Sequence, residues 1–133
     1  MALLIDTDLL IGLERTAAPA AGVGAALGGE ECTISVITVS ELLHGVLRAS
    51  SGVRTRRRAF VEHVLAGLEA IPITEPIARL HAEIWAELST RGESIGAHDL
   101  WIAATAIAHG LGVATGNATH FERVPGLRVV ASP

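Results

Sequence analysis

The stretch LLIDTDLLIGLER, residues 3–15, contains two patterns in direct succession. Its first part, residues 3–6, is an apolar run that ends on the carboxylate of Asp6, and it predicts a buried strand. From Thr7 onward the apolar residues recur at helical spacing and give way to charged residues, which predicts a helix over residues 7–15. The stretch therefore predicts a strand that passes directly into a helix, as in proteins that alternate the two.

The same succession recurs along the chain. Apolar and β-branched segments predict strands at residues 3–6, 32–38, 71–74, 113–115 and 127–132. Helical spacing predicts helices at residues 7–15, 39–50, 75–92 and 98–112, and residues 54–70 form a further amphipathic segment. Residues 16–29, rich in Ala, Gly and Pro, are compatible with a loop, a short helix or both. This alternation predicts an α/β sandwich around a mainly parallel sheet.

Length and composition limit the organisation of the chain. Its 133 residues, half of them apolar, suffice for one hydrophobic core, and no repeat or linker divides them, so we expect a single domain over residues 1–133. The one cysteine, Cys32, excludes an intramolecular disulfide, and together with the lack of a signal-peptide pattern it favours a cytoplasmic protein. The longest uncharged stretch, residues 100–121, is interrupted by glycines, so no membrane association is expected.

The charged residues limit the ligands. The net charge is −4, so contact with a nucleic acid has to be local rather than driven by overall charge. All ten basic residues are arginines, which excludes mechanisms that depend on lysine. No G-x-G-x-x-G turn follows a strand and no G-x-x-x-x-G-K motif is present, which argues against a nucleotide cofactor.

Three carboxylates stand where predicted helices begin. Asp6 and Glu41 follow predicted strands, and Asp99 opens the most apolar helix. Because ligands of parallel α/β sheets bind beyond the carboxyl ends of the strands, these side chains can converge there. Each also has a simpler interpretation as a helix cap: Asp6, or Thr7 after it, can cap the first helix, and Asp99 the last. TVSE at residues 38–41 matches a capping box.

Considered together, the three carboxylates favour a metal site. Converging carboxylates repel one another, and burial raises their pKa values unless a cation neutralises them. Oxygen ligands with few or no cysteine or histidine partners are typical of Mg²⁺ or Mn²⁺. Such a cation can polarise a phosphoryl oxygen and activate water for attack on a phosphodiester.

Three blocks of sequence resemble the motifs of PIN-domain proteins, in particular the VapC-type toxins of bacterial toxin–antitoxin pairs. The blocks are LIDTDLLIGLE (residues 4–14), SVITVSELLHGV (residues 35–46) and HDLWIAATAIAHGLGVATGNATHFERVPGLRVV (residues 98–130). The resemblance implies a three-layer α/β/α sandwich and an endoribonuclease that cleaves RNA with Mg²⁺ or Mn²⁺. It also implies a homodimer that a cognate antitoxin holds inactive, with a helix or extended segment in a groove and an arginine near the acids.

The resemblance assigns roles to the acids. Asp6 and Asp99 match direct metal ligands, and Glu41 matches a ligand or the residue that orients a metal-bound water. Many relatives carry a fourth acid after the strand that follows the last long helix, whereas this chain has Asn117 there, with His120 nearby. Asn117 can supply a carbonyl oxygen, hold a metal-bound water, or be a turn residue. His120 can approach a phosphate or lie at the surface. The candidate catalytic residues are therefore Asp6, Glu41, Asp99 and Asn117.

Other charged residues lie outside this set. Arg54 and Arg56 to Arg58 can contact RNA phosphates or an acidic partner, or they can form a solvated helix start. Asp8 and Glu14 are expected to be solvated acids, with Glu14 paired at most with its neighbour on the helix surface.

Aromatic residues are too few for a platform on which bases stack. Trp85 and Trp101 lie in apolar helical patterns and are expected in the core. The scattered histidines are expected to be structural or exposed, and His98, which precedes Asp99, is the first of them to test.

Two alternative functions remain open. DTD at residues 6–8 resembles the D-x-D of aspartate-nucleophile phosphatases, but the chain is short and has no lysine to bind the phosphate. The other alternative is a PIN-fold binding module without nuclease activity. The missing fourth acid favours this module, whereas Asp6, Glu41 and Asp99 argue against it.

Overall fold

The computed structural model describes residues 2–16 and 27–131. In these ranges the strands are β1 (Leu3–Ile5), β2 (Cys32–Ser35), β3 (Glu69–Ile71), β4 (Gly112–Thr115) and β5 (Val129–Ala131). The helices there are α1 (Thr7–Glu14), α3 (Val36–Arg48), α4 (Ser51–Gly67), α5 (Glu75–Arg91), α6 (Ala97–Ala108) and α7 (Ala118–Phe121). The predicted alternation of strands and helices is confirmed, and most of residues 16–29, whose structure the pattern left open, lie outside the described ranges.

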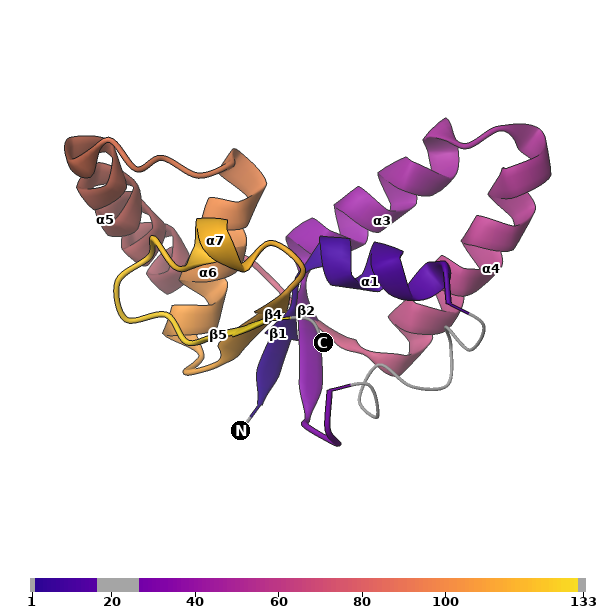
Figure 1. The fold of residues 1–133 in the computed structure, drawn as a ribbon, viewed down its shortest axis with the longest axis horizontal. Coiled ribbons are helices and arrows are strands. Elements are labelled where there is room, and N and C mark those ends of the chain that lie inside the picture. Colours follow the sequence, from indigo (N-terminus) through magenta and orange to yellow (C-terminus); the bar gives the residue numbers. More distant parts are fainter. Residues whose placement is uncertain (1, 17–26, 132–133) are drawn as a thin grey trace.

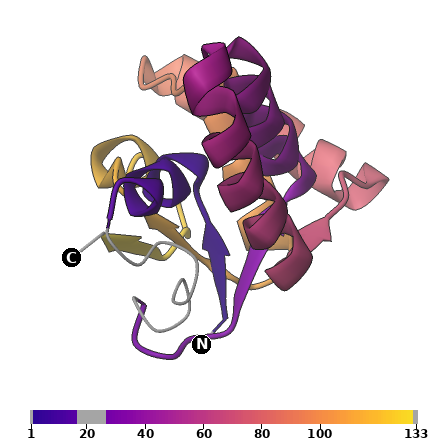
Figure 2. The ribbon, with the colours of Figure 1, turned by 90° about the vertical axis from the view of Figure 1, so that its right-hand side faces the viewer.

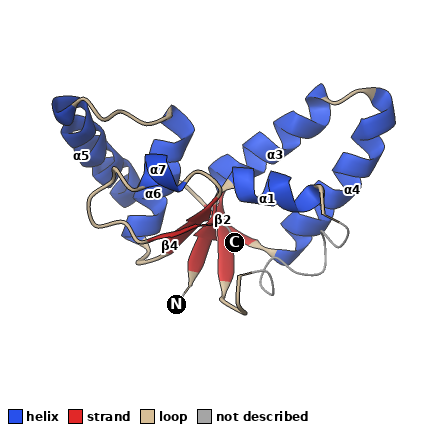
Figure 3. Cartoon of the chain, in the orientation of Figure 1, coloured by secondary structure: helices blue, strands red, loops and turns tan. Residues whose placement is uncertain are grey.

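The five described strands form one sheet in the order β3-β2-β1-β4-β5, and every pairing is parallel. Figure 3 shows the strands between two groups of helices. Leu3 of the central strand β1 is in register with Cys32 of β2 on one side and with Gly112 of β4 on the other. The chain runs outward from β1 to β3 and then returns to the other side of β1 for β4 and β5. This reversal makes the carboxyl ends of β1 and β4 the expected place for a ligand.

Helices cover both faces of the sheet, which confirms the three-layer sandwich. In Figure 1, α5, α6 and α7 lie to the left of the strands and α1, α3 and α4 to the right. Viewed from that right-hand side, α3 and α4 lie in front of the strands (Figure 2). The side chains of β1 alternate between two buried clusters: Leu3 and Ile5 pack with α1, α3 and α4, whereas Leu4 packs with α5 and α6. Because both faces are covered, the strand is a continuous apolar run.

The most apolar predicted helix is α6, and it is buried as expected. Ile102, Ala103, Ala104 and Ala106 are fully buried. Their small side chains allow α6 to pack against α5, β1 and β4 at once. Asp99 lies in the first turn of this helix, so the packing of α6 fixes its position.

The boundary between β2 and α3 differs from the prediction. Residues 32–38 were expected to be one strand, but β2 ends at Ser35, whose Oγ accepts a hydrogen bond of 3.0 Å from the amide of Ile37 and caps α3. The capping box at residues 38–41 is therefore wrong, since Thr38 is fully buried inside the helix. The β-branched run after Ser35 misled the prediction because β-branched residues also occur in helices when packing favours them.

The region around β3 also differs. This strand comprises Glu69–Ile71 rather than residues 71–74, because Pro72 has no N–H to donate to a ladder. Trp85 was expected in the core, but 59% of its surface is exposed on α5. Trp101 is partly buried and stacks on the His81 ring, with 3.6 Å between ring centroids.

Among the described residues, no helix combines the length and the apolar character needed to cross a membrane.

Candidate active site

Asp6 follows β1 directly and lies at the carboxyl end of the central strand. It is buried, with 2% of its surface exposed. Its amide donates to the carbonyl of Ala114 at 2.8 Å, and its Oδ2 accepts a hydrogen bond of 2.7 Å from Thr115 Oγ1. Burial raises the pKa of Asp6 from its ordinary value of 3.8 to about 6, and the Thr115 hydroxyl opposes that rise. The charges of Asp99 and Asp8 add to it.

The interpretation of these acids as helix caps is wrong. Asp6 occupies the N-cap position of α1, but its side chain makes no capping hydrogen bond. Thr7 is already the first helical residue. Asp99 lies in the first turn of α6, whose N-cap residue is Gly96. Neither carboxylate therefore serves as the side-chain cap of its helix, although the Thr7 amide lowers the pKa of Asp6.

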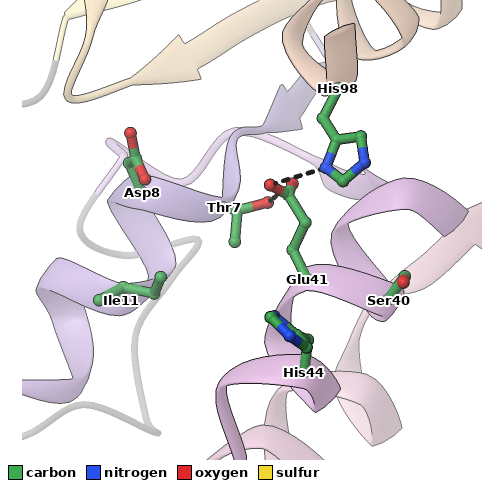
Figure 4. Close-up of a pocket in the computed structure, with 7 residues that line it drawn as sticks. All are labelled: Thr7, Asp8, Ile11, Ser40, Glu41, His44 and His98. Carbon is green, nitrogen blue, oxygen red and sulfur yellow. Dashed lines mark hydrogen bonds and ion pairs between the residues drawn. The ribbon is translucent and has the colours of Figure 1, made fainter. Parts of the chain in front are cut away.

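Glu41 reaches the same region from α3 and is held by two side chains from other elements (Figure 4). Its Oε1 accepts a hydrogen bond of 2.7 Å from Thr7 Oγ1, and its Oε2 lies 3.2 Å from Nδ1 of His98. The Thr7 hydroxyl is also hydrogen-bonded to the buried Thr38 hydroxyl at 3.0 Å. This network ties the starts of α1, α3 and α6 together around one carboxylate.

The carboxylate of Asp99 is half-buried in the first turn of α6. Burial raises its pKa, and the negative charges of Glu41 and Asp8 raise it further. His120, whose Nδ1 lies 3.9 Å from Asp99 Oδ2, opposes the rise. The charge of Glu41 raises the pKa of Asp99, and the charge of Asp99 raises the pKa of Asp6. The structure therefore brings the three predicted acids into one electrostatic unit.

Asp8 belongs to the same unit, so the prediction of an ordinary solvated acid at this position is wrong. Its side chain is exposed, yet its charge raises the pKa of both Asp6 and Asp99. The available signal was its place in the first turn of the helix that begins directly after Asp6. Thr7 and Thr115 were not predicted as partners of the acids, because hydroxyl residues carry no pattern that marks such contacts.

The donors at this site fit a hard divalent cation. Carboxylates whose pKa values are raised by burial and by one another gain from a positive charge between them. Within residues 2–16 and 27–131, however, no group of three or more His, Cys, Asp or Glu side chains is placed so that it could hold a metal ion. Mg²⁺ binds through one or two carboxylates and keeps several waters, so it does not require such a group.

Asn117 lies at the edge of this site. Its amide donates to Thr115 Oγ1 at 2.8 Å, so it supports the hydroxyl that holds Asp6. Its side-chain nitrogen lies 2.9 Å from Nδ1 of His120, the ring that faces Asp99. Asn117 is thus linked to two acids through Thr115 and His120, and none of its described hydrogen bonds goes directly to a carboxylate.

Among the four arginines proposed to contact RNA or a partner, Arg54 and Arg57 have partners within the chain. Arg57 Nε lies 3.2 Å from the Glu14 carboxylate and joins α4 to α1, so the expectation that Glu14 pairs at most with its sequence neighbour is wrong. Arg54 donates to the carbonyls of Leu47 and Ala49 at the end of α3. Whether these arginines also contact RNA or a partner protein stays a prediction.

Comparison with known proteins decides the family. A model of the PIN domain matches residues 3–127. The chain belongs to the PIN-domain family. The match includes every element of this PIN domain that carries an acid of the site, and among the described elements it omits only β5.

Individual relatives are similar over nearly the whole PIN domain. The chain is 36% identical over 134 residues to Ribonuclease VapC1 of Rickettsia felis, which covers 98% of this chain and 96% of that relative. It is 31% identical to Ribonuclease VapC4 of Mycobacterium tuberculosis, with 96% and 94% covered. Among solved structures, DNA-bound VapBC from Salmonella typhimurium matches with a TM-score of 0.88 and 29% identity over 100% of this chain and 99% of that one.

Proposed function

We propose that the chain is a metal-dependent endoribonuclease toxin that cleaves RNA and is neutralised by a cognate antitoxin. The observation that carries this proposal is the unit of Asp6, Glu41 and Asp99 at the carboxyl end of β1, where the buried Asp6 has a pKa raised to about 6. The similarity to proteins named VapC ribonucleases supports RNA as the substrate.

Each residue of the site has a separate proposed role. Asp6 and Asp99 would hold Mg²⁺ or Mn²⁺, and Glu41 would bind it or orient a water beside it. When bound, the cation supplies positive charge at the scissile phosphate and lowers the cost of the negative charge that develops there. Thr115 holds Asp6 and Thr7 holds Glu41 through hydrogen bonds of 2.7 Å each, so both carboxylates are oriented before a ligand arrives. Asn117 and His120 support Asp99 and Thr115 from the edge of the site.

An antitoxin is the expected protein partner. A structure from Mycobacterium tuberculosis that is similar to this chain (TM-score 0.76, 28% identity) belongs to the VapBC family of toxin–antitoxin systems. The cluster of Asp6, Asp8, Glu41 and Asp99 offers several negative charges that an arginine of such a partner can pair with. We also place the protein in the cytoplasm, where an RNA target and an antitoxin are both accessible.

A homodimer is proposed on the basis of the family, and the surface around Trp85 supports it. The exposed Trp85 ring meets His81 edge to face, and His81 stacks on Trp101. These three rings border an open cavity of about 310 Å³ whose other walls include Leu100. A second copy can place its own Trp85 in this cavity, because a symmetric contact presents the same surface twice.

A binding module without nuclease activity is the second candidate, and the observation that favours it is Asn117 in place of a fourth acid. The phosphatase alternative is set aside because the chain belongs to the PIN-domain family.

The test is to titrate Mn²⁺ and Mg²⁺ calorimetrically into the wild type and Asp99→Asn, and then to incubate both with end-labelled total RNA and each metal. Glu83→Gln, which removes an exposed carboxylate on α5, is the matched control. We expect binding and cleavage in the wild type and in the control, and neither in Asp99→Asn. Metal binding without cleavage by the wild type would support the binding module.

A further inference from the structure

A cavity of about 420 Å³ opens beside the acidic site. It lies between α1 and α3 next to the start of α6 (Figure 4). Glu41 forms part of its wall, and His98 of α6 closes it through the 3.2 Å contact with Glu41 Oε2. Whatever occupies this cavity therefore lies directly beside one of the proposed metal ligands.

The remaining walls include the acid Asp8 and Thr7 of α1, together with three residues of different chemistry. Ser40 and His44 are one turn apart on α3 and so lie on the same side of that helix. Ile11 of α1 lies across the cavity from His44 in Figure 4, and it is a large apolar side chain with 37% of its surface exposed. The cavity thus combines the two carboxylates of Asp8 and Glu41 with an apolar side chain, two hydroxyls and two imidazoles.

This combination suits a planar ring that carries hydrogen-bonding groups. Unpaired bases of RNA are recognised by stacking on aromatic or apolar side chains and by hydrogen bonds to their edges. A cation such as an arginine of a protein partner would use the carboxylates and gain little from Ile11 and His44. Because Ile11 and His44 lie across the cavity from each other, the walls favour a nucleobase, and the carboxylates of Asp8 and Glu41 can accept hydrogen bonds from donors on its edge.

We propose that this cavity binds the base of a nucleotide next to the scissile phosphate. In this arrangement Ile11 and His44 contact the two faces of the base and Ser40 hydrogen-bonds to its edge. The proposal rests on the proposed ribonuclease function, because the cavity and the acidic site share Glu41. It makes Ile11, Ser40 and His44 determinants of which RNA sequence is cleaved, rather than residues that act on the phosphate.

The activity test uses a set of short single-stranded RNAs in which the nucleotides around one position are varied, with Mn²⁺ present. We expect His44→Ala and Ile11→Ala to raise KM by about tenfold and to weaken the preference for one base beside the cut, the effect of a lost base contact. The kcat and the Mn²⁺ affinity should stay near the wild-type values. His109→Ala, at the opposite end of α6 from Asp99, is the control and should behave like the wild type.

A second readout needs neither metal nor turnover. Each of the four nucleoside 5′-monophosphates is titrated into the ¹⁵N-labelled wild type and His44→Ala in EDTA, and amide shifts are recorded. Shifts at Ile11, Ser40 and His44 that depend on the base and vanish in His44→Ala would support the proposal. Shifts there with N-acetyl-arginine amide but with no nucleotide would overturn it and assign the cavity to a protein partner.

The outcomes separate the two proposals. A wild type that cleaves no RNA contradicts the ribonuclease function itself. A wild type that cleaves RNA, with both cavity variants equal to His109→Ala in KM and in base preference, overturns only the assignment of the cavity.

Discussion

Replacing Asp6 by Asn should stabilise the metal-free protein at neutral pH while it removes the metal site. In the folded chain the pKa of Asp6 is raised from 3.8 to about 6 because the carboxylate is buried. The folded state therefore binds this proton more tightly than the unfolded state does. The resulting stabilisation is complete below pH 3.8 and is lost as the pH rises through about 6.

The size of the effect follows from the shift. A difference between 3.8 and about 6 corresponds to roughly 3 kcal/mol that the charged carboxylate costs the fold at pH 7.5. Asparagine is uncharged at every pH, and its side-chain oxygen can still accept the hydrogen bond from Thr115. Asp6→Asn should therefore be more stable than the wild type at pH 7.5 by up to about 3 kcal/mol, with the difference shrinking toward pH 4.

Urea unfolding in EDTA at several pH values between 4 and 8 measures this difference directly. Glu83→Gln, which removes an exposed acid, should leave the pH dependence unchanged. In Mg²⁺ the difference should nearly vanish, because a ligand at one hundred times its Kd adds about 2.7 kcal/mol to the stability of the wild type, which binds it. If Asp6→Asn were no more stable than the wild type at pH 7.5 in EDTA, the claim that a buried charge strains this site would be refuted.

Three further predictions concern the surroundings of the site. Thr115→Val removes the hydrogen-bond donor to Asp6, so it should raise the pKa of Asp6 further and weaken Mn²⁺ binding in calorimetry. Thr115→Ser keeps the hydroxyl and should retain the wild-type pKa and Mn²⁺ affinity. Equal Mn²⁺ affinities for the two variants would contradict the role of the hydroxyl. A double-mutant cycle of Glu14→Gln and Arg57→Gln should give a coupling energy of about 1 kcal/mol in urea unfolding, since the pair is only partly buried, and additive effects would show that the pair contributes nothing. Trp85→Glu should convert the dimer to a monomer in light scattering, with little change in the free energy of unfolding per monomer. If the wild type is a dimer and the variant has the same mass, the dimer contact lies elsewhere.

The architecture could be predicted because it depends on local pattern. Leu3, Leu4 and Ile5 are all apolar because helices cover both faces of the sheet, and the helix after them follows from side-chain spacing. The positions of Asp6 directly after a strand and of Asp99 in the first turn of a helix were readable for the same reason, whereas Glu41 was expected at a helix start and lies in the second turn of α3. General rules for parallel sheets then indicated that these acids meet.

The boundaries and the partners could not be predicted. The run after Ser35 has strand-like composition but is helical, because packing of α3 outweighs the local preference of β-branched residues. Trp85 was placed in the core by its apolar helical pattern, yet it lies on the outer side of α5. The ion pair of Glu14 and Arg57 joins residues far apart in the sequence, and no local pattern encodes such a pair.

The sequence by itself determined the order of strands and helices and the residue types available at the carboxyl ends of the strands, since both depend on neighbours along the chain. Only the tertiary structure decided that Asp6 is buried under the Thr115 hydroxyl, that Thr7 and His98 hold Glu41, and that Asp8 adds its charge. The physical reason is that burial and hydrogen bonding are properties of a position in space. They set the pKa values of the acids, and with them the capacity of the site to bind a cation.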